Sequence, residues 1–176
     1  MTAKDLGRIH VLTGPGKGKT TAAFGLALRA AGHGLRVCIV QFMKTGMTTG
    51  ETIAAKRLGE IQVHQFGTGK FVDPKNITDG DRRCASEALE FARTMAGKDA
   101  CDLLILDEVN MAVDYGLLDL SALLTLLKSR GEGVEVVLSG RNAPKELIDI
   151  ADYVSYIDNR KHPFGKGQKA RQGIEW

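Results

Sequence analysis

A glycine-rich turn near the amino terminus has the residue types and the spacing to hold the phosphates of a nucleotide. Residues 13–20 read TGPGKGKT and lie between a strand-like and a helix-like segment, which is the context of a Walker A phosphate loop. Glycines let backbone N–H groups converge on phosphate oxygens, and the following helix directs its positive dipole end at the same point. Lys19 would add a mobile cation, and the Thr20 hydroxyl would bind Mg²⁺. The nucleotide-binding residues predicted from this turn are Gly14, Pro15, Gly16, Lys17, Gly18, Lys19, Thr20 and Thr21.

An acidic motif is expected to face this turn. Residues 103–108 read LLILDE, an apolar strand that ends in two carboxylates, as in a Walker B motif. Because the carboxyl ends of parallel strands meet at one edge of a sheet, we expect Asp107 and Glu108 near the phosphate loop. If the strand continues through both residues, their side chains point in different directions, so one can ligate a metal while the other orients water or Thr20. Together the two motifs predict a site for Mg²⁺ (or Mn²⁺) and a nucleoside triphosphate.

These two motifs do not by themselves define the reaction. A protein with a phosphate loop hydrolyses ATP, transfers its phosphoryl group, or does neither. A small kinase or ATPase is therefore one hypothesis, although the sequence shows no evident lid or acceptor domain. A nucleotide- or nucleic-acid-binding module without enzymatic activity is another. Nucleic acid is not the expected partner, because aromatic residues are only 6 % of the chain and form no evident stacking platform.

The elements that would position these motifs alternate between strand-like and helix-like segments. This alternation predicts an α/β fold, with one mainly parallel sheet of about six strands and helices on both faces. Residues 61–66 alternate apolar and polar side chains, so this strand is expected at an edge. The expected helices cover residues 20–32, 51–58, 79–97, 120–129 and 144–150. The expected strands cover residues 8–13, 36–42, 61–66, 102–107, 135–139 and 153–157.

Length and composition indicate one globular domain over residues 1–176, with 43 % hydrophobic and 26 % charged residues. No apolar run approaches the ~20 residues that cross a bilayer, and no signal-peptide core is evident, so a cytoplasmic protein without a membrane partner is expected. The three cysteines form no CxxC pair, so neither a zinc site nor a disulfide framework is predicted. The net charge is +3, and basic residues gather in a tail at residues 159–176, which reads either as a solvated surface or as a site for an anionic ligand.

Further motifs, in order along nearly the whole chain, resemble those of corrinoid adenosyltransferases of the CobA/CobO/BtuR type. Residues 13–25, TGPGKGKTTAAFG, resemble that family's signature TGNGKGKTTAAFG. Thr13 stands where an ordinary phosphate loop has its first glycine, which is consistent with the reversed position of ATP in this family. The matching motifs that follow are VQFMK at 40–44, GTG at 67–69, LDEVN at 106–110, SGR at 139–141, DIAD at 149–152, and KH, KA and GIEW at 161–162, 169–170 and 173–176.

The resemblance implies a RecA-like fold and transfer of the 5′-deoxyadenosyl group of ATP to the cobalt of a reduced corrinoid. Co(I), in cob(I)alamin or a corrinoid precursor, is a nucleophile strong enough to attack the ribose C5′ without a general base, and triphosphate leaves. Lys19, Thr20 and Glu108 are the implied catalytic residues, which would stabilise this leaving group. Thr20 and Glu108 are the implied metal ligands, and Asp107 is implied to contact these ligands rather than the metal itself. Arg141 is implied to contact ATP, the alternative being an arginine at the surface or the sheet edge.

The resemblance also implies a largely apolar corrinoid site, in which a flavoprotein reductase makes Co(I) from Co(II), and a homodimer. The loop at residues 67–76 would form the wall, with Phe71 as the corrinoid contact; the alternative is that Phe71 packs on the core. Known relatives carry two aromatic residues in this loop, whereas residues 70–72 here read KFV. Seven residues precede the first strand, whereas some relatives have a longer segment that caps the site, so residues 43–50 and the basic tail are candidates for that role.

Overall fold

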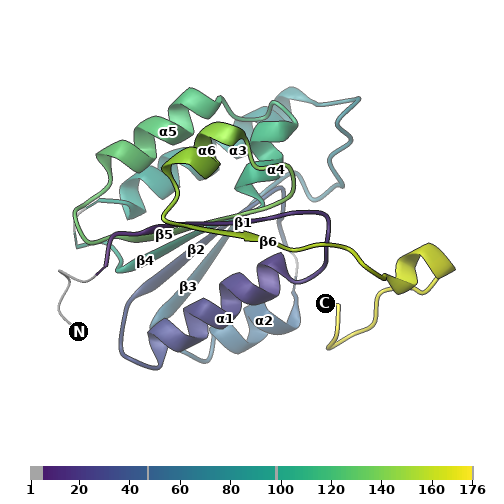
Figure 1. Cartoon of the computed structure of the whole chain (residues 1–176), viewed down its shortest axis with the longest axis horizontal. Coiled ribbons are helices and arrows are strands. Elements are labelled where there is room, and N and C mark those ends of the chain that lie inside the picture. The colour runs from purple at the N-terminus through teal and green to yellow at the C-terminus, as the bar shows by residue number, and fades with distance from the viewer. Residues whose placement is uncertain (1–5, 47, 98, 176) are drawn as a thin grey trace.

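The computed structural model describes residues 6–46, 48–97 and 99–175, and it contains one parallel β-sheet with helices on both faces (Figure 1). The sheet has six strands in the order β3-β2-β4-β5-β1-β6, and every neighbouring pair is parallel. The α/β fold predicted from the alternating segments is therefore confirmed. The strands are β1 (Ile9–Thr13), β2 (Val37–Phe42), β3 (Ile61–Phe66), β4 (Leu103–Asp107), β5 (Glu135–Ser139) and β6 (Tyr153–Tyr156).

Helices α1 and α2 cover one face of the sheet, and α3, α4, α5 and α6 cover the other (Figure 1). Because successive side chains of a strand point to opposite faces, Ile39 and Ile105 belong to the apolar core shared with α1, whereas Val40 and Leu106 belong to the other core. Strands covered on both faces need apolar residues at nearly every position, which explains the run VCIVQF in β2. None of the helices described is long and apolar enough to cross a membrane. The helices are α1 (Lys19–Ala31), α2 (Gly50–Ala55), α3 (Asp79–Met95), α4 (Val109–Asp114), α5 (Leu120–Ser129), α6 (Lys145–Ile150) and the 3-10 turn η2 (Pro163–Lys166).

Strands β3 and β6 form the two edges of the sheet. The edge position and partial exposure of β3 agree with the alternation in its sequence. All four residues of β6 are exposed, and within the described residues this strand pairs with β1 alone. The apolar side chains of Tyr153, Val154 and Tyr156 therefore lie beside an unpaired strand edge.

A short helix that the sequence did not predict follows β4. A single residue, Glu108, separates the strand from helix α4, whose Val109 and Ala112 are fully buried. Glu108 has φ 64°, in the left-handed region, and this residue turns the chain from strand to helix. The strand ends at Asp107, so the condition that it continues through Glu108 is not met, and this turn rather than strand alternation separates the two carboxylates. The predicted helix over residues 51–58 ends early, at Ala55. Helix α4 has only six residues, too few to show a helical period, so the sequence pattern did not reveal it.

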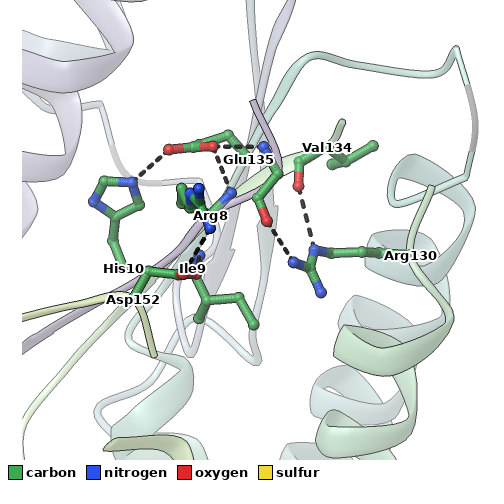
Figure 2. Close-up of polar contacts among 8 residues, drawn as sticks. Arg8, Ile9, His10, Arg130, Val134, Glu135 and Asp152 are labelled. Atoms are coloured by element: carbon green, nitrogen blue, oxygen red, sulfur yellow. Dashed lines mark hydrogen bonds and ion pairs between the residues drawn. The ribbon is translucent and has the colours of Figure 1, made fainter. Parts of the chain in front are cut away.

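A polar cluster joins β1, β5 and β6 at the amino end of β1 (Figure 2). Glu135 accepts backbone hydrogen bonds from Gly7 and Arg8, both at 2.7 Å, and its Oε1 lies 2.6 Å from Nε2 of His10. Asp152 accepts a further backbone hydrogen bond from β1 at 2.8 Å. Burial opposes ionisation of Glu135, but the hydrogen bonds from His10 and the backbone lower its pKa overall. These contacts fix the strand register at the end of the sheet that lies away from the phosphate loop.

Candidate active site

The loops that follow β1, β2, β4 and β5 line one open cavity of about 750 Å³ at the carboxyl edge of the sheet, where parallel α/β sheets bind ligands. All the predicted site residues except Gly14 and Asp107 contribute to the lining. The cavity combines two kinds of surface. The polar lining includes residues 15–21, Lys44, Glu51, Glu108 and Arg141, and the apolar lining includes Phe24, Phe71, Met111, Tyr115 and Ile174.

Two glycines of the phosphate loop are required by the chain that follows β6. A Cβ on Gly14 would lie 2.5 Å from the carbonyl oxygen of Ile157, and a Cβ on Gly16 would lie 2.5 Å from that of Asp158. The N–H of Gly16 also donates a hydrogen bond to the Ile157 carbonyl at 2.8 Å. The loop is therefore braced against the segment that leads into the basic tail, a second reason for glycine besides the approach of phosphate.

Lys19 begins α1, and its side chain lies within the phosphate loop. Its Nζ donates hydrogen bonds to the carbonyl oxygens of Gly14 at 2.8 Å and Gly16 at 2.7 Å, and the residue is only 7 % exposed. Burial lowers the pKa of Lys19, and the nearby Glu108 partly offsets this effect. The ammonium group can exchange its two carbonyl acceptors for phosphate oxygens without leaving the loop.

Asp107 is the buried centre of a polar network that joins the loops. Its Oδ1 accepts hydrogen bonds from Thr20 Oγ1 at 3.0 Å and from Ser139 Oγ at 2.6 Å. Its Oδ2 accepts from Gln41 Nε2 at 2.9 Å and from Lys44 Nζ at 2.8 Å. Burial disfavours its charged form, but Lys44 and the hydrogen bonds keep the pKa of Asp107 below its ordinary value. Both oxygens of this carboxylate are thus occupied, and the network fixes the hydroxyl of Thr20.

Glu108 differs from its neighbour because part of its carboxylate is unsatisfied. The left-handed turn separates it from the strand, and its N–H donates to Ser139 Oγ at 3.1 Å. Its Oε2 is buried and has no hydrogen-bond partner within the part of the chain that the structure describes. Burial, reinforced by the charge of Asp107, raises the pKa of Glu108. A buried acceptor without a donor is costly, so this oxygen is suited to a cation or a donor brought by a ligand.

The loop after β3 presents an aromatic side chain to the cavity. Phe71 is 90 % exposed and lines the cavity, so the alternative that it packs on the core is wrong. The next residue, Val72, is 7 % exposed and takes the core position instead. Arg141 is exposed and also lines the cavity, and its positive charge acts to lower the pKa values of both Lys19 and Glu108.

The structure adds residues to which the sequence assigned no role. Three of these residues, Lys44, Gln41 and Ser139, lie within the motifs that resemble the family, so the motifs could have pointed to them. The motifs do not show, however, that all three contact Asp107. Buried Asn110 donates through Nδ2 to the carbonyl oxygen of Gly140 at 3.3 Å, which ties α4 to the loop after β5. Trp176, the last residue of the matched ending, lies outside the described residues. Residues 1–5 also lie outside them, and so does Met47, one residue of the segment 43–50 that was a candidate cap.

Comparison with known proteins gives similarities over nearly the whole chain. A family model described as "ATP:corrinoid adenosyltransferase BtuR/CobO/CobP" matches residues 5–176. A "Corrinoid adenosyltransferase" of Sinorhizobium sp. is 38 % identical over 173 residues, which are 97 % of this chain and 80 % of that protein. One of Escherichia coli (strain K12) is 36 % identical over 170 residues, 97 % and 86 % of the two chains. A "Corrinoid adenosyltransferase CobA" of Salmonella typhimurium is 35 % identical over 173 residues, 98 % and 87 % of the two chains.

Proposed function

The chain belongs to the ATP:corrinoid adenosyltransferase family, and from this we infer that it transfers the 5′-deoxyadenosyl group of ATP to the Co(I) centre of a reduced corrinoid. Such a reaction serves the formation of adenosylcobalamin, by biosynthesis or by salvage. The structural observation that carries this function is one cavity that joins a phosphate loop and a buried acidic pair to an apolar lining. A small kinase or ATPase is not favoured, because relatives that span most of the chain are named for adenosyl transfer.

The chemistry places the main demand on the leaving group. An electron pair of Co(I) forms the bond to the ribose C5′, the C5′–O bond breaks, and its electrons depart with triphosphate. No general base is required, but the growing negative charge must be stabilised. The loop N–H groups, the amino end of α1, Lys19 and Lys17 are the groups of this chain that would supply positive potential.

A Mg²⁺ ion (or Mn²⁺) held by Thr20 and Glu108 is part of this proposal. Glu108 offers a buried oxygen that has no partner among the described residues, and Asp107 orients the Thr20 hydroxyl at 3.0 Å. Mg²⁺ is commonly bound by one or two protein ligands and by waters and substrate phosphates, so these residues fit such an ion. When bound, the ion would neutralise charge on the triphosphate. Arg141, at the lining of the same cavity, would contact ATP.

Anaerobic mixing of the protein with MgATP and chemically reduced cob(I)alamin tests the function. We expect the visible spectrum of adenosylcobalamin to develop, one equivalent of triphosphate to form, and excess EDTA to stop the reaction. Release of ADP or orthophosphate without a Co–C bond would contradict adenosyl transfer and would favour the kinase or ATPase. Repeating the assay with corrinoid precursors would identify the preferred corrinoid.

Phe71 is the corrinoid contact that we propose, in a site where a flavoprotein reductase converts Co(II) to Co(I). Its ring is exposed in the cavity, and the buried Val72 anchors the loop that carries it. An aromatic ring can pack against the apolar face of a macrocycle, and partial burial of a phenylalanine side chain in this way is worth about 1 kcal/mol.

Replacing Phe71 by alanine is expected to slow adenosylation that starts from Co(II) and a reduced flavoprotein by about two- to tenfold, as loss of one partly buried apolar side chain predicts. The reaction from preformed Co(I) should be less affected. Leu28→Ala is the matched control, since Leu28 is an exposed apolar residue on α1 that does not line the cavity. An unchanged rate from Co(II) in Phe71→Ala would remove Phe71 from the corrinoid site.

A homodimer formed through β6 is the quaternary state that we propose. The edge of β6, which no other described strand pairs with, and its exposed apolar side chains would be covered if two copies paired about a two-fold axis. Val154→Lys is therefore expected to convert a dimer to a monomer in sedimentation-velocity experiments, with Leu28→Lys as the control that leaves the dimer intact. A wild-type protein that sediments as a monomer at micromolar concentration would contradict the proposal.

A further inference from the structure

The last described residues of the chain return to the phosphate loop. Figure 1 shows the carboxyl-terminal segment leading away from β6 and then back towards the connection between β1 and α1. The contact is made by Lys17, whose Nζ donates to Glu175 Oε1 at 2.9 Å and to the carbonyl oxygen of Ile174 at 3.3 Å. Glu175 of the tail therefore pairs with Lys17, a cation of the phosphate loop, and we assign this loop to the triphosphate group.

Glu175 also organises the turn in which it lies. Its carboxylate accepts from the Arg171 side chain at 3.1 and 3.2 Å and from the Arg171 backbone N–H at 2.8 Å. The hydrogen bonds from Arg171 and Lys17 lower the pKa of Glu175 to about 2, so the carboxylate is ionised at neutral pH. Glu175 is the only acidic residue after Asp158 in an otherwise basic tail. Glu175 is thus the one acidic side chain that this turn brings to the phosphate loop.

This arrangement conflicts with a bound triphosphate. Residues 173–175 line the same cavity as residues 15–21, so the Glu175 carboxylate and the phosphates would face the same cation across a short distance. Both are anions with oxygen acceptors, and like charges at close range repel. Two of the three N–H donors of Lys17 go to the tail and leave one for a phosphate oxygen, so a fuller contact with triphosphate requires Lys17 to release the tail.

We propose that Glu175 is a built-in competitor of the triphosphate group, which holds Lys17 before nucleotide binds and takes it back when triphosphate leaves. This inference rests on the proposed function, since it assigns triphosphate to the phosphate loop. The exchange costs little free energy, because Lys17 replaces one anionic partner by another and Glu175 keeps its ion pair with Arg171. Its consequence is weaker binding of the leaving group and faster release of the inorganic product.

Calorimetric titration of the full-length protein with inorganic triphosphate and Mg²⁺ tests the proposal. Glu175→Gln keeps the shape of the side chain but removes its charge, and it should tighten triphosphate binding by about 1.5- to fivefold, the range expected for loss of one exposed ion pair. Inhibition of the transferase by added triphosphate should strengthen by the same factor. Glu132→Gln is the matched control, since Glu132 is an exposed acid between α5 and β5, and it should change neither value.

The Lys17→Ala background shows whether the effect passes through Lys17. There, Glu175→Gln should no longer change triphosphate affinity, because the shared cation is gone. Trp176, the one tryptophan of the chain, follows Glu175 directly, and its fluorescence anisotropy reports on the tail. Triphosphate should lower this anisotropy in the wild type, and Glu175→Gln should start from the lowered value.

The outcomes separate this inference from the function on which it rests. Unchanged affinity in Glu175→Gln, or equal tightening with and without Lys17, would overturn the competition, while loss of binding in Lys19→Ala would still support the assignment of triphosphate to the loop. A wild-type protein that binds no triphosphate would overturn both.

Discussion

Lys19→Ala is expected to lower the rate of adenosyl transfer by about 10²- to 10³-fold, the effect typical of removing one donor that stabilises charge in a transition state. The ammonium group lies inside the loop, within 2.8 Å of two carbonyl oxygens, and is almost fully buried. A cation in such a partly desolvated position interacts more strongly with a departing triphosphate than a surface lysine does. The loss should appear in kcat more than in the KM for the corrinoid, which Lys19 is not proposed to contact.

Single-turnover kinetics with preformed cob(I)alamin measure this effect free of the reduction step. Lys128→Ala is the control, since Lys128 is an exposed lysine on α5 that lies outside the cavity. Lys19→Ala also removes two hydrogen bonds to the loop, so its thermal unfolding should be compared with that of Lys19→Gln. A folded Lys19→Ala protein with the wild-type rate would show that leaving-group stabilisation does not depend on this residue.

Asp107→Ala is expected to reduce the free energy of unfolding by about 3–5 kcal/mol, the cost of breaking a buried ion pair from one side. Asp107 is fully buried, and its removal leaves Lys44 without its carboxylate and three hydrogen-bond donors without their acceptor. Urea unfolding measures the difference. Asp149→Ala removes the same charge from an exposed pair with Lys145 on α6, and it should cost about 0–1 kcal/mol.

Two further measurements distinguish the buried pair from simple loss of packing. Asp107→Ala combined with Lys44→Met should recover part of the lost stability, because no unpaired charge then remains. The pKa of Asp107 is lowered in the folded state, so its contribution is present above the ordinary aspartate pKa of 3.8 and is lost as the pH falls through the folded-state value. The difference between wild type and Asp107→Ala should therefore shrink in acid. An Asp107→Ala cost no larger than that of Asp149→Ala would contradict the role of this network.

Much of the fold could be predicted because its signals are local in the sequence. Apolar runs of strand length alternate with helical periods, and this pattern indicated the six strands and five of the helices. The phosphate loop could be predicted equally well, because its glycines, Lys19 and Thr20 lie close together in the chain and their chemistry follows from residue type. Helix α4 was missed because its six residues are too few to show a helical period, and the left-handed backbone at Glu108 that starts it is not visible in the sequence.

By itself, the sequence determined the fold class, the phosphate loop, the acidic pair and the family resemblance. Only the tertiary structure decided that both oxygens of Asp107 are hydrogen-bonded while, within the described part of the chain, Glu108 keeps a buried oxygen without a partner. It also decided that Phe71 faces the cavity rather than the core and that Glu175 pairs with Lys17. The reason is physical. These properties depend on contacts between residues far apart in the chain, which form only when the order of the strands brings their loops to one edge. Residue type and spacing determine which groups are available, whereas burial and partner determine which of them remains free for a ligand.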